Sequence, residues 1–261
     1  MKLIGYGITD IGRVKQVNQD SLFYAVADDG KSGVFAVADG VGGLKFGEVA
    51  SAKATEHIAK WWRFFYRPDF IKDMENVVDS LSHLIYVINK DVYAFNEANQ
   101  TQSATTLSLI LLFGESYCIA HVGDSRVYAC VRSENRIYQL TTDHSRDIIR
   151  EKNGRKFVQS ALTDGIGHKK SIKCDLYFGP LNSSVNGFLV CSDGIYKRQN
   201  EQQIANILFA DEPNACSNLI LGAKQAGESD NITAAFVNID YEIGYNAFSQ
   251  ADSFENGGVC K

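Results

Sequence analysis

The sequence lacks the features that mark several large classes of protein. Its 26 lysine and arginine residues are outnumbered by 31 aspartate and glutamate residues and form no basic cluster, so the charge pattern of a nucleic-acid-binding protein is missing. The longest strongly apolar run, residues 107–113, is too short to span a bilayer, and the N-terminus has no apolar signal-peptide core. We therefore predict a cytoplasmic protein without nucleic-acid or membrane partners.

The common signatures of cysteine, nucleotide and zinc chemistry are also missing. None of the six cysteines belongs to a C-x-x-C pair, and Cys118, Cys130 and Cys191 lie in apolar segments, which predicts small buried side chains in a reducing compartment. The glycines of residues 40–47 complete neither G-x-G-x-x-G nor a P-loop. G-x-S-x-G and H-E-x-x-H do not occur, and the five histidines show no ligand spacing.

Hydrophobic periodicity predicts a mixed architecture in a chain of 261 residues. Strands that follow one another in hairpin-like succession, with helices early and late, predict an α+β domain whose sheets pack as a sandwich with helices outside. We assign residues 1–240 to this domain, expect 104–131 to form an antiparallel meander, and expect 141–170 to be irregular. The polar tail 241–261 should be weakly ordered. The predicted helices are 47–67, 74–95, 201–209 and 214–226, and the predicted strands are 2–9, 21–28, 33–38, 104–113, 116–122, 126–131, 186–192 and 232–239.

Five aspartates lie at the ends of predicted strands. The run VFAVADGVGG passes from an apolar strand directly into Asp39-Gly40, and the same pattern recurs at Asp193 in VCSDG. Asp20 precedes the second strand, Asp124 lies in HVGDSR between two strands, and Asp230 precedes the last strand. Taken singly, an Asp-Gly at a strand end is most often a turn. Taken together, these acids can converge at one edge of packed sheets.

Converged carboxylates repel one another and are costly to desolvate. A hard divalent cation with oxygen ligands offsets that cost, and the absence of thiolate and paired histidine ligands favours Mg²⁺ or Mn²⁺ over Zn²⁺. The glycine after Asp39 or Asp193 then has a role, because a residue without Cβ lets the backbone approach an ion closely.

The motifs GRVKQVNQDS, FAVADGVGG, SATTLSLILL, AHVGDSRVYAC, DHS, FLVCSDGIY and SDNITAAFV occur in this order. The set resembles the metal-dependent protein serine/threonine phosphatases of type 2C in their compact bacterial form, from about residue 5 to 240. The resemblance implies a four-layer α-β-β-α sandwich of two mainly antiparallel sheets flanked by helices. It also implies hydrolysis of phosphoserine and phosphothreonine on proteins by a water molecule that two metal ions activate.

The resemblance also implies roles for individual residues. Asp39 resembles the carboxylate that bridges both metal ions, and Gly40 resembles a carbonyl ligand. Asp193 and Asp230 match acids that hold one ion, and Asp20 matches an acid that contacts the site directly or through water.

Asp124 matches a ligand of the third, weaker ion found in some members. The implied cofactor is thus two ions of Mn²⁺ or Mg²⁺, with a third at Asp124. The implied partners are phosphoprotein substrates, among them a Ser/Thr kinase and its targets, and we expect a monomer.

The sequence departs from the family pattern at several positions. Lys15 stands where the family usually has the arginine that grips the substrate phosphate, with Arg13 two residues earlier, and a lysine offers only a point charge. Gln19 replaces a common glutamate, and the segment 143–167 looks shorter than the usual flap beside the site. DGVGG lacks the histidine of eukaryotic members, which leaves the general acid open between water and His144.

Two other functions remain open at this point. The first is a pseudophosphatase, which binds phosphoprotein without turnover and is suggested only by Lys15 and Gln19. The second is a metal-independent interaction protein whose aspartates merely end strands.

Overall fold

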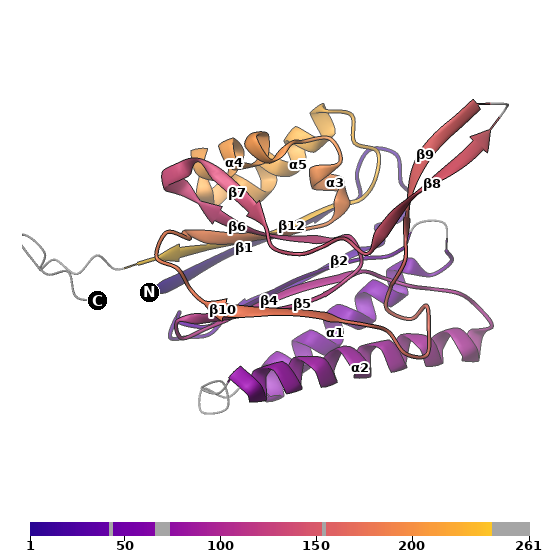
Figure 1. The fold of residues 1–261 in the computed structure, drawn as a ribbon, viewed down its shortest axis with the longest axis horizontal. Coiled ribbons are helices and arrows are strands. Elements are labelled where there is room, and N and C mark those ends of the chain that lie inside the picture. The colour runs from indigo at the N-terminus through magenta and orange to yellow at the C-terminus, as the bar shows by residue number, and fades with distance from the viewer. Residues whose placement is uncertain (42–43, 66–73, 153–154, 242–261) are drawn as a thin grey trace, which may run out of the picture.

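The computed structural model describes residues 1–41, 44–65, 74–152 and 155–241, and within them two five-stranded sheets lie face to face between helices (Figure 1). Every neighbouring pair of strands in these sheets is antiparallel. The first sheet has the order β1 (Lys2–Asp10), β12 (Ile232–Asp240), β11 (Gly187–Cys191), β6 (Arg126–Val131), β7 (Arg136–Gln139). The second has the order β10 (Asp175–Pro180), β5 (Ser116–Val122), β4 (Leu107–Phe113), β3 (Gly33–Asp39), β2 (Asp20–Val26).

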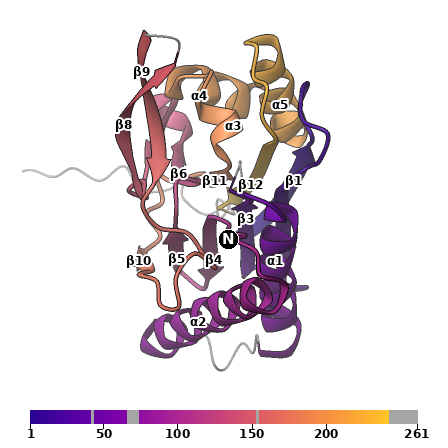
Figure 2. The ribbon, with the colours of Figure 1, turned by 90° about the vertical axis from the view of Figure 1, so that its right-hand side faces the viewer.

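Helices cover the outer face of each sheet and complete the four-layer α-β-β-α sandwich (Figure 2). Two long helices pack on the second sheet and three shorter ones on the first. On the second sheet lie α1 (Gly47–Phe65) and α2 (Met74–Asn99); on the first lie α3 (Asp193–Tyr196), α4 (Glu201–Ala210) and α5 (Ala215–Gln225), with the short 3-10 helices η2 (Arg132–Glu134) and η3 (Glu212–Asn214) in connections. None of the described helices is long and apolar enough to cross a lipid bilayer.

Strand β3 is buried on both faces, which explains why its sequence is apolar without alternation. Val34, Ala36 and Ala38 are buried toward α1 and α2, while Phe35 and Val37 are buried toward the first sheet. A strand that is covered on both faces needs apolar residues at every position. The apolar run therefore ends only where the strand leaves the core, and Asp39 is the residue at that end.

Most predicted elements are confirmed with small shifts at their ends. The strand predicted at 104–113 begins only at Leu107, and the helix predicted at 74–95 continues to Asn99. Strands β7 and β10 and the one-turn helix α3 were not predicted. Cys118, Cys130 and Cys191 are buried and free, as expected. The prediction for the tail concerns residues 242–261, which lie outside the described residues.

Two predictions about the middle of the chain are wrong. The expected meander ends after the β4–β5 hairpin, because β6 leaves the second sheet and pairs with β7 and β11 in the first. The segment 141–170, expected to be irregular, contains a two-stranded antiparallel sheet of β8 (Ser145–Lys152) and β9 (Arg155–Leu162). This hairpin projects from the sandwich as an arm (Figure 1), so it has no core face and no clear hydrophobic alternation.

Candidate active site

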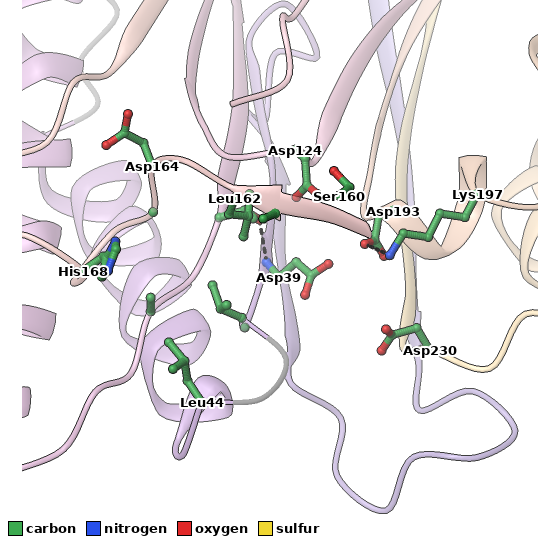
Figure 3. Close-up of a pocket in the computed structure, with 16 residues that line it drawn as sticks. Asp39, Leu44, Asp124, Ser160, Leu162, Asp164, His168, Asp193, Lys197 and Asp230 are labelled. Carbon is green, nitrogen blue, oxygen red and sulfur yellow. Dashed lines mark hydrogen bonds and ion pairs between the residues drawn. The ribbon is translucent and has the colours of Figure 1, made fainter. Parts of the chain in front are cut away.

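The aspartates at the strand ends converge at one end of the sandwich, as predicted. Asp39, Asp124, Asp193 and Asp230 line a single cavity of about 560 Å³, and Figure 3 shows their side chains around it. They come from the end of β3, the turn between β5 and β6, the start of α3 and the turn before β12. Asp20 faces Asp39 directly in the β2–β3 ladder and is buried, with 6% of its surface exposed.

The Asp20 carboxylate is fixed on one oxygen and unpartnered on the other. Its Oδ2 accepts hydrogen bonds from Ser192 Oγ at 2.8 Å and Thr233 Oγ1 at 2.7 Å, which tie it to the first sheet. Its Oδ1 is buried and has no hydrogen-bond partner. Burial raises the pKa of Asp20 to about 6 although the two hydroxyl bonds lower it. Burial of a carboxylate oxygen without a partner costs free energy, and a cation bound to this oxygen would offset that cost.

Asp39 is held by its backbone, which leaves its side chain free to face the cavity. Its N–H donates to Thr106 Oγ1 at 3.0 Å, and its carbonyl accepts the N–H of Thr106 at 2.8 Å. Burial raises the pKa of Asp39 well above its usual value, and the other four carboxylates of the cluster raise it further. The same two causes raise the pKa of Asp124 to about 6, burial first and then the charge of Asp193. The cluster therefore carries more negative charge than the protein itself compensates.

The glycines that follow two of the acids allow segments of the chain to touch. A Cβ on Gly40 would lie 2.5 Å from the backbone of Gly47 at the start of α1 and 2.7 Å from the Gln19 carbonyl oxygen. A Cβ on Gly194 would lie 2.2 Å from the carbonyl oxygen of Asn231. Close packing of the backbone thus requires both glycines, whether or not an ion is approached.

Two lysines reach the cluster. Lys15 Nζ lies 2.6 Å from Asp230 Oδ1, and Lys197 Nζ forms an ion pair with Asp193 Oδ2. Lys15 therefore contacts an acid of the cluster, and its role in binding phosphate stays a prediction. Lys197 was not predicted; its position four residues after Asp193 is the signal that could have revealed it. In the described part of the chain, no three acidic, histidine or cysteine side chains already form a ligand set around one point.

His144 supports the turn that carries Asp124. Its Nδ1 accepts the N–H of Gly123 at 3.2 Å, so its Nε2 carries the proton and donates to Asp175 at 3.0 Å. Both ring nitrogens are thus occupied, which argues against the predicted option that His144 is the general acid. His168, which the sequence did not single out, lines the cavity on the side away from Asp193 and Asp230 (Figure 3).

The base of the β8–β9 arm forms one wall of the cavity. Ser160, Ala161 and Leu162 of β9 line it, together with Asp164 just beyond the strand (Figure 3). Leu44 contributes from the opposite side, before α1. The cavity thus has a floor of carboxylates and a wall that belongs to a projecting hairpin, and a substrate group on that floor would also contact the arm.

Comparison with known proteins agrees with this arrangement. The family model described as protein phosphatase 2C matches residues 11–216. Protein phosphatase PhpP of Streptococcus pneumoniae is 28% identical over 249 residues, which cover 90% of this chain and 97% of that protein. The serine/threonine phosphatase stp of Listeria innocua is 29% identical over 241 residues, which cover 88% and 93%.

A crystal structure of the serine/threonine phosphatase Stp1 from Staphylococcus aureus has the same fold, with a TM-score of 0.78. It is 24% identical in sequence, and the match covers 92% of this chain and 96% of that one. The chain belongs to the protein phosphatase 2C family. It is accordingly an enzyme, and the expected family and fold are confirmed. Dependence on divalent metal ions is general for this family.

Proposed function

We propose that the carboxylate-lined cavity is the active site at which this protein serine/threonine phosphatase hydrolyses phosphoserine and phosphothreonine on proteins with two divalent cations. The observation that carries the proposal is the buried, unpartnered Oδ1 of Asp20 next to four more carboxylates. Oxygen ligands of this kind are those that Mg²⁺ and Mn²⁺ prefer. The donor set therefore fits these ions, and we assign either of them as the cofactor.

The residues that would hold the ions follow from their positions. Asp39, at the centre of the cluster, would bridge the two ions, and the Gly40 carbonyl next to it would be a further ligand. Asp193 and Asp230 lie on neighbouring segments, joined by the contact of Gly194 with Asn231, and would share one ion.

The two remaining acids have supporting roles in this proposal. Asp20 would contact the site through its unpartnered oxygen, directly or through water. Asp124, in the turn that His144 supports, would hold a third ion.

When bound, the two cations would lower the pKa of a water molecule so that it can attack phosphorus, and would neutralise charge on the phosphoryl oxygens. The protein's own groups hold the acids in place and neutralise charge on the phosphoryl group. Ser192 and Thr233 hold Asp20 in place, and Lys15 supplies an ammonium group at the rim that can neutralise phosphoryl charge. Cys191, two residues before Asp193, is no alternative nucleophile, because complete burial raises the pKa of its thiol and keeps it protonated.

The partners of this enzyme in our proposal are phosphoproteins. We include an opposing Ser/Thr kinase and its targets among them, and we propose that the enzyme is a monomer that acts in the cytoplasm. The binding-only alternative predicts a protein that retains phosphopeptide but releases no phosphate, and the following experiment separates the two.

Asp39→Asn removes the proposed bridging charge and keeps the size of the side chain. Release of phosphate from a phosphothreonine peptide should fall by at least about 100-fold, which is typical for loss of a group that stabilises the transition state. The matched control is Asp91→Asn on α2, which also removes one aspartate charge but lies in an ion pair with Lys53 outside the cavity. EDTA should abolish wild-type turnover, and Mn²⁺ or Mg²⁺ should restore it.

Two outcomes would contradict the proposal. If Asp39→Asn kept the wild-type rate, Asp39 would not bridge the ions. If the wild-type protein bound the phosphopeptide but released no phosphate with either cation, it would be a pseudophosphatase.

A further inference from the structure

The ion pair between Lys197 and Asp193 is a feature that the proposed mechanism does not use. Helix α3 begins at Asp193, after β11 and the N-cap residue Ser192, and Lys197 is its C-terminal cap residue, one turn later. This i, i+4 spacing places both side chains on the same side of the turn. Figure 3 shows the Lys197 side chain extended along the cavity with its ammonium group at the Asp193 carboxylate.

The ion pair is buried on the side of the acid and half-exposed on the side of the amine. The Asp193 side chain is 12% exposed and that of Lys197 is 45% exposed. Burial disfavours the charge on Lys197, yet the Asp193 carboxylate outweighs it and raises the pKa of the amine, so the ammonium stays charged at neutral pH. Burial also raises the pKa of Asp193, and the ammonium lowers it again. Lys197 therefore compensates part of the negative charge of the cluster.

We propose that Lys197 competes with the divalent cation for the Asp193 carboxylate and thereby sets the metal affinity of this site. The inference rests on the metal site of the proposed function. A carboxylate oxygen can bind an ion and accept a hydrogen bond at the same time, but the lone pair of Asp193 Oδ2 that the ammonium group holds becomes free for an ion only when Lys197 is displaced. After displacement, the charge of Lys197 remains beside the ion and repels it. Both effects weaken metal binding.

Lys197 differs in this respect from the other cation at the cluster. Lys15 reaches Asp230 from the loop between β1 and β2, and its position matches a phosphate-binding one. Lys197 is tethered four residues from the acid it contacts, so its effective concentration at that acid is high. The neighbouring Arg198 does not share the role, because its Nε lies 3.7 Å from Glu228.

The test is the dissociation constant of Mn²⁺, measured by isothermal titration calorimetry on protein freed of metal with EDTA and then dialysed. Lys197→Gln should bind Mn²⁺ about threefold to tenfold more tightly than wild type, since a half-exposed ion pair is worth up to about 1 kcal/mol and the lost repulsion adds to it. The gain should shrink in high salt, because both effects are screened. Lys197→Arg keeps the charge and should bind Mn²⁺ like wild type.

Lys53→Gln is the matched control, because it removes a lysine that also pairs with an aspartate, at 3.0 Å between α1 and α2, away from the cavity. It should leave the Mn²⁺ affinity unchanged. If Lys197→Gln binds Mn²⁺ as weakly as wild type, or more weakly, the inference is overturned while the metal site itself stands. If wild type does not bind Mn²⁺ at all, the proposed site fails instead.

Discussion

Gly194→Ala should damage catalysis although it alters neither a charge nor a proposed ligand. An added Cβ would lie 2.2 Å from the Asn231 carbonyl oxygen, whereas carbon and oxygen atoms in contact are about 3.3 Å apart. The two segments must therefore separate by roughly 1 Å, the difference between these two distances. One segment carries Asp193 and the other carries Asp230, so the separation pulls apart two acids of the cluster.

Asn231 cannot yield easily to the added methyl group. Its Oδ1 accepts the N–H of Gln19 at 2.9 Å, and its Nδ2 donates to the carbonyls of Ile11 at 2.9 Å and Val17 at 3.2 Å. A shift of Asn231 would thus disturb the whole loop that precedes Asp20. A misplacement of about 1 Å in an active site can cost about 100-fold in rate, which corresponds to about 2.7 kcal/mol.

The assay is kcat/KM for phosphate release from a phosphothreonine peptide at saturating Mn²⁺, with the melting temperature measured alongside. We expect a loss of about 30-fold to 100-fold in kcat/KM, together with about 1–3 kcal/mol of stability for overpacking. Gly179→Ala on β10 is the matched control, because its nearest neighbour, the Tyr117 hydroxyl oxygen, would lie at an ordinary contact distance of 3.5 Å. If Gly194→Ala retained kcat/KM within threefold of wild type, the close approach would not position the acids.

Two further predictions concern stability. In EDTA, the melting temperature should fall as pH rises from about 4 to 7. Burial raises the folded-state pKa values of Asp20 and Asp124 to about 6 from 3.8 and raises that of Asp39 as well, so these acids bind more protons in the folded protein than in the unfolded chain. Burial lowers the pKa of His121 to about 4, which acts in the opposite direction, but the three acids outweigh the one histidine. Saturating Mn²⁺ should flatten this slope in thermal melts. A melting temperature in EDTA that rises over this pH range would contradict the prediction. Phe188→Ala should cost about 3–5 kcal/mol in urea unfolding, because Phe188 is 2% exposed between the two sheets; a loss below about 1 kcal/mol would contradict this packing.

The central strands of the two sheets could be predicted from the sequence because both of their faces are buried. In β3 and β4 every position from Val34 to Ala38 and from Leu107 to Phe113 is buried, so the two runs are apolar apart from the buried Ser108. The ends of such runs are where the chain leaves the core. This is why the aspartates that follow or precede the runs could be recognised as one set before their positions in space were known.

The path of the chain between the sheets could not be predicted in the same way. The turn with Gly123 and Asp124 resembles the hairpin turn around Gly114. The chain returns along the same sheet after the turn around Gly114, whereas it crosses to the other sheet after the turn with Gly123 and Asp124. Local sequence gives no signal for this choice, because β6 is equally apolar in either sheet. The β8–β9 arm and the one-turn helix α3 lack a periodic pattern for a related reason: one has no core face and the other is too short.

The glycines next to Asp39 and Asp193 connect the fold of the site to its chemistry. The sequence suggested that they let the backbone approach an ion, whereas the structure places other backbone segments against them: Gly47 and Gln19 at one, Asn231 at the other. These contacts bring acids from distant strands into one cluster. Carboxylates repel one another, so a cluster of this kind persists only where packing of the backbone holds its members together. The contacts that bring the acids together therefore concentrate negative charge that a cation can neutralise, and Lys197 neutralises part of this charge without a metal ion.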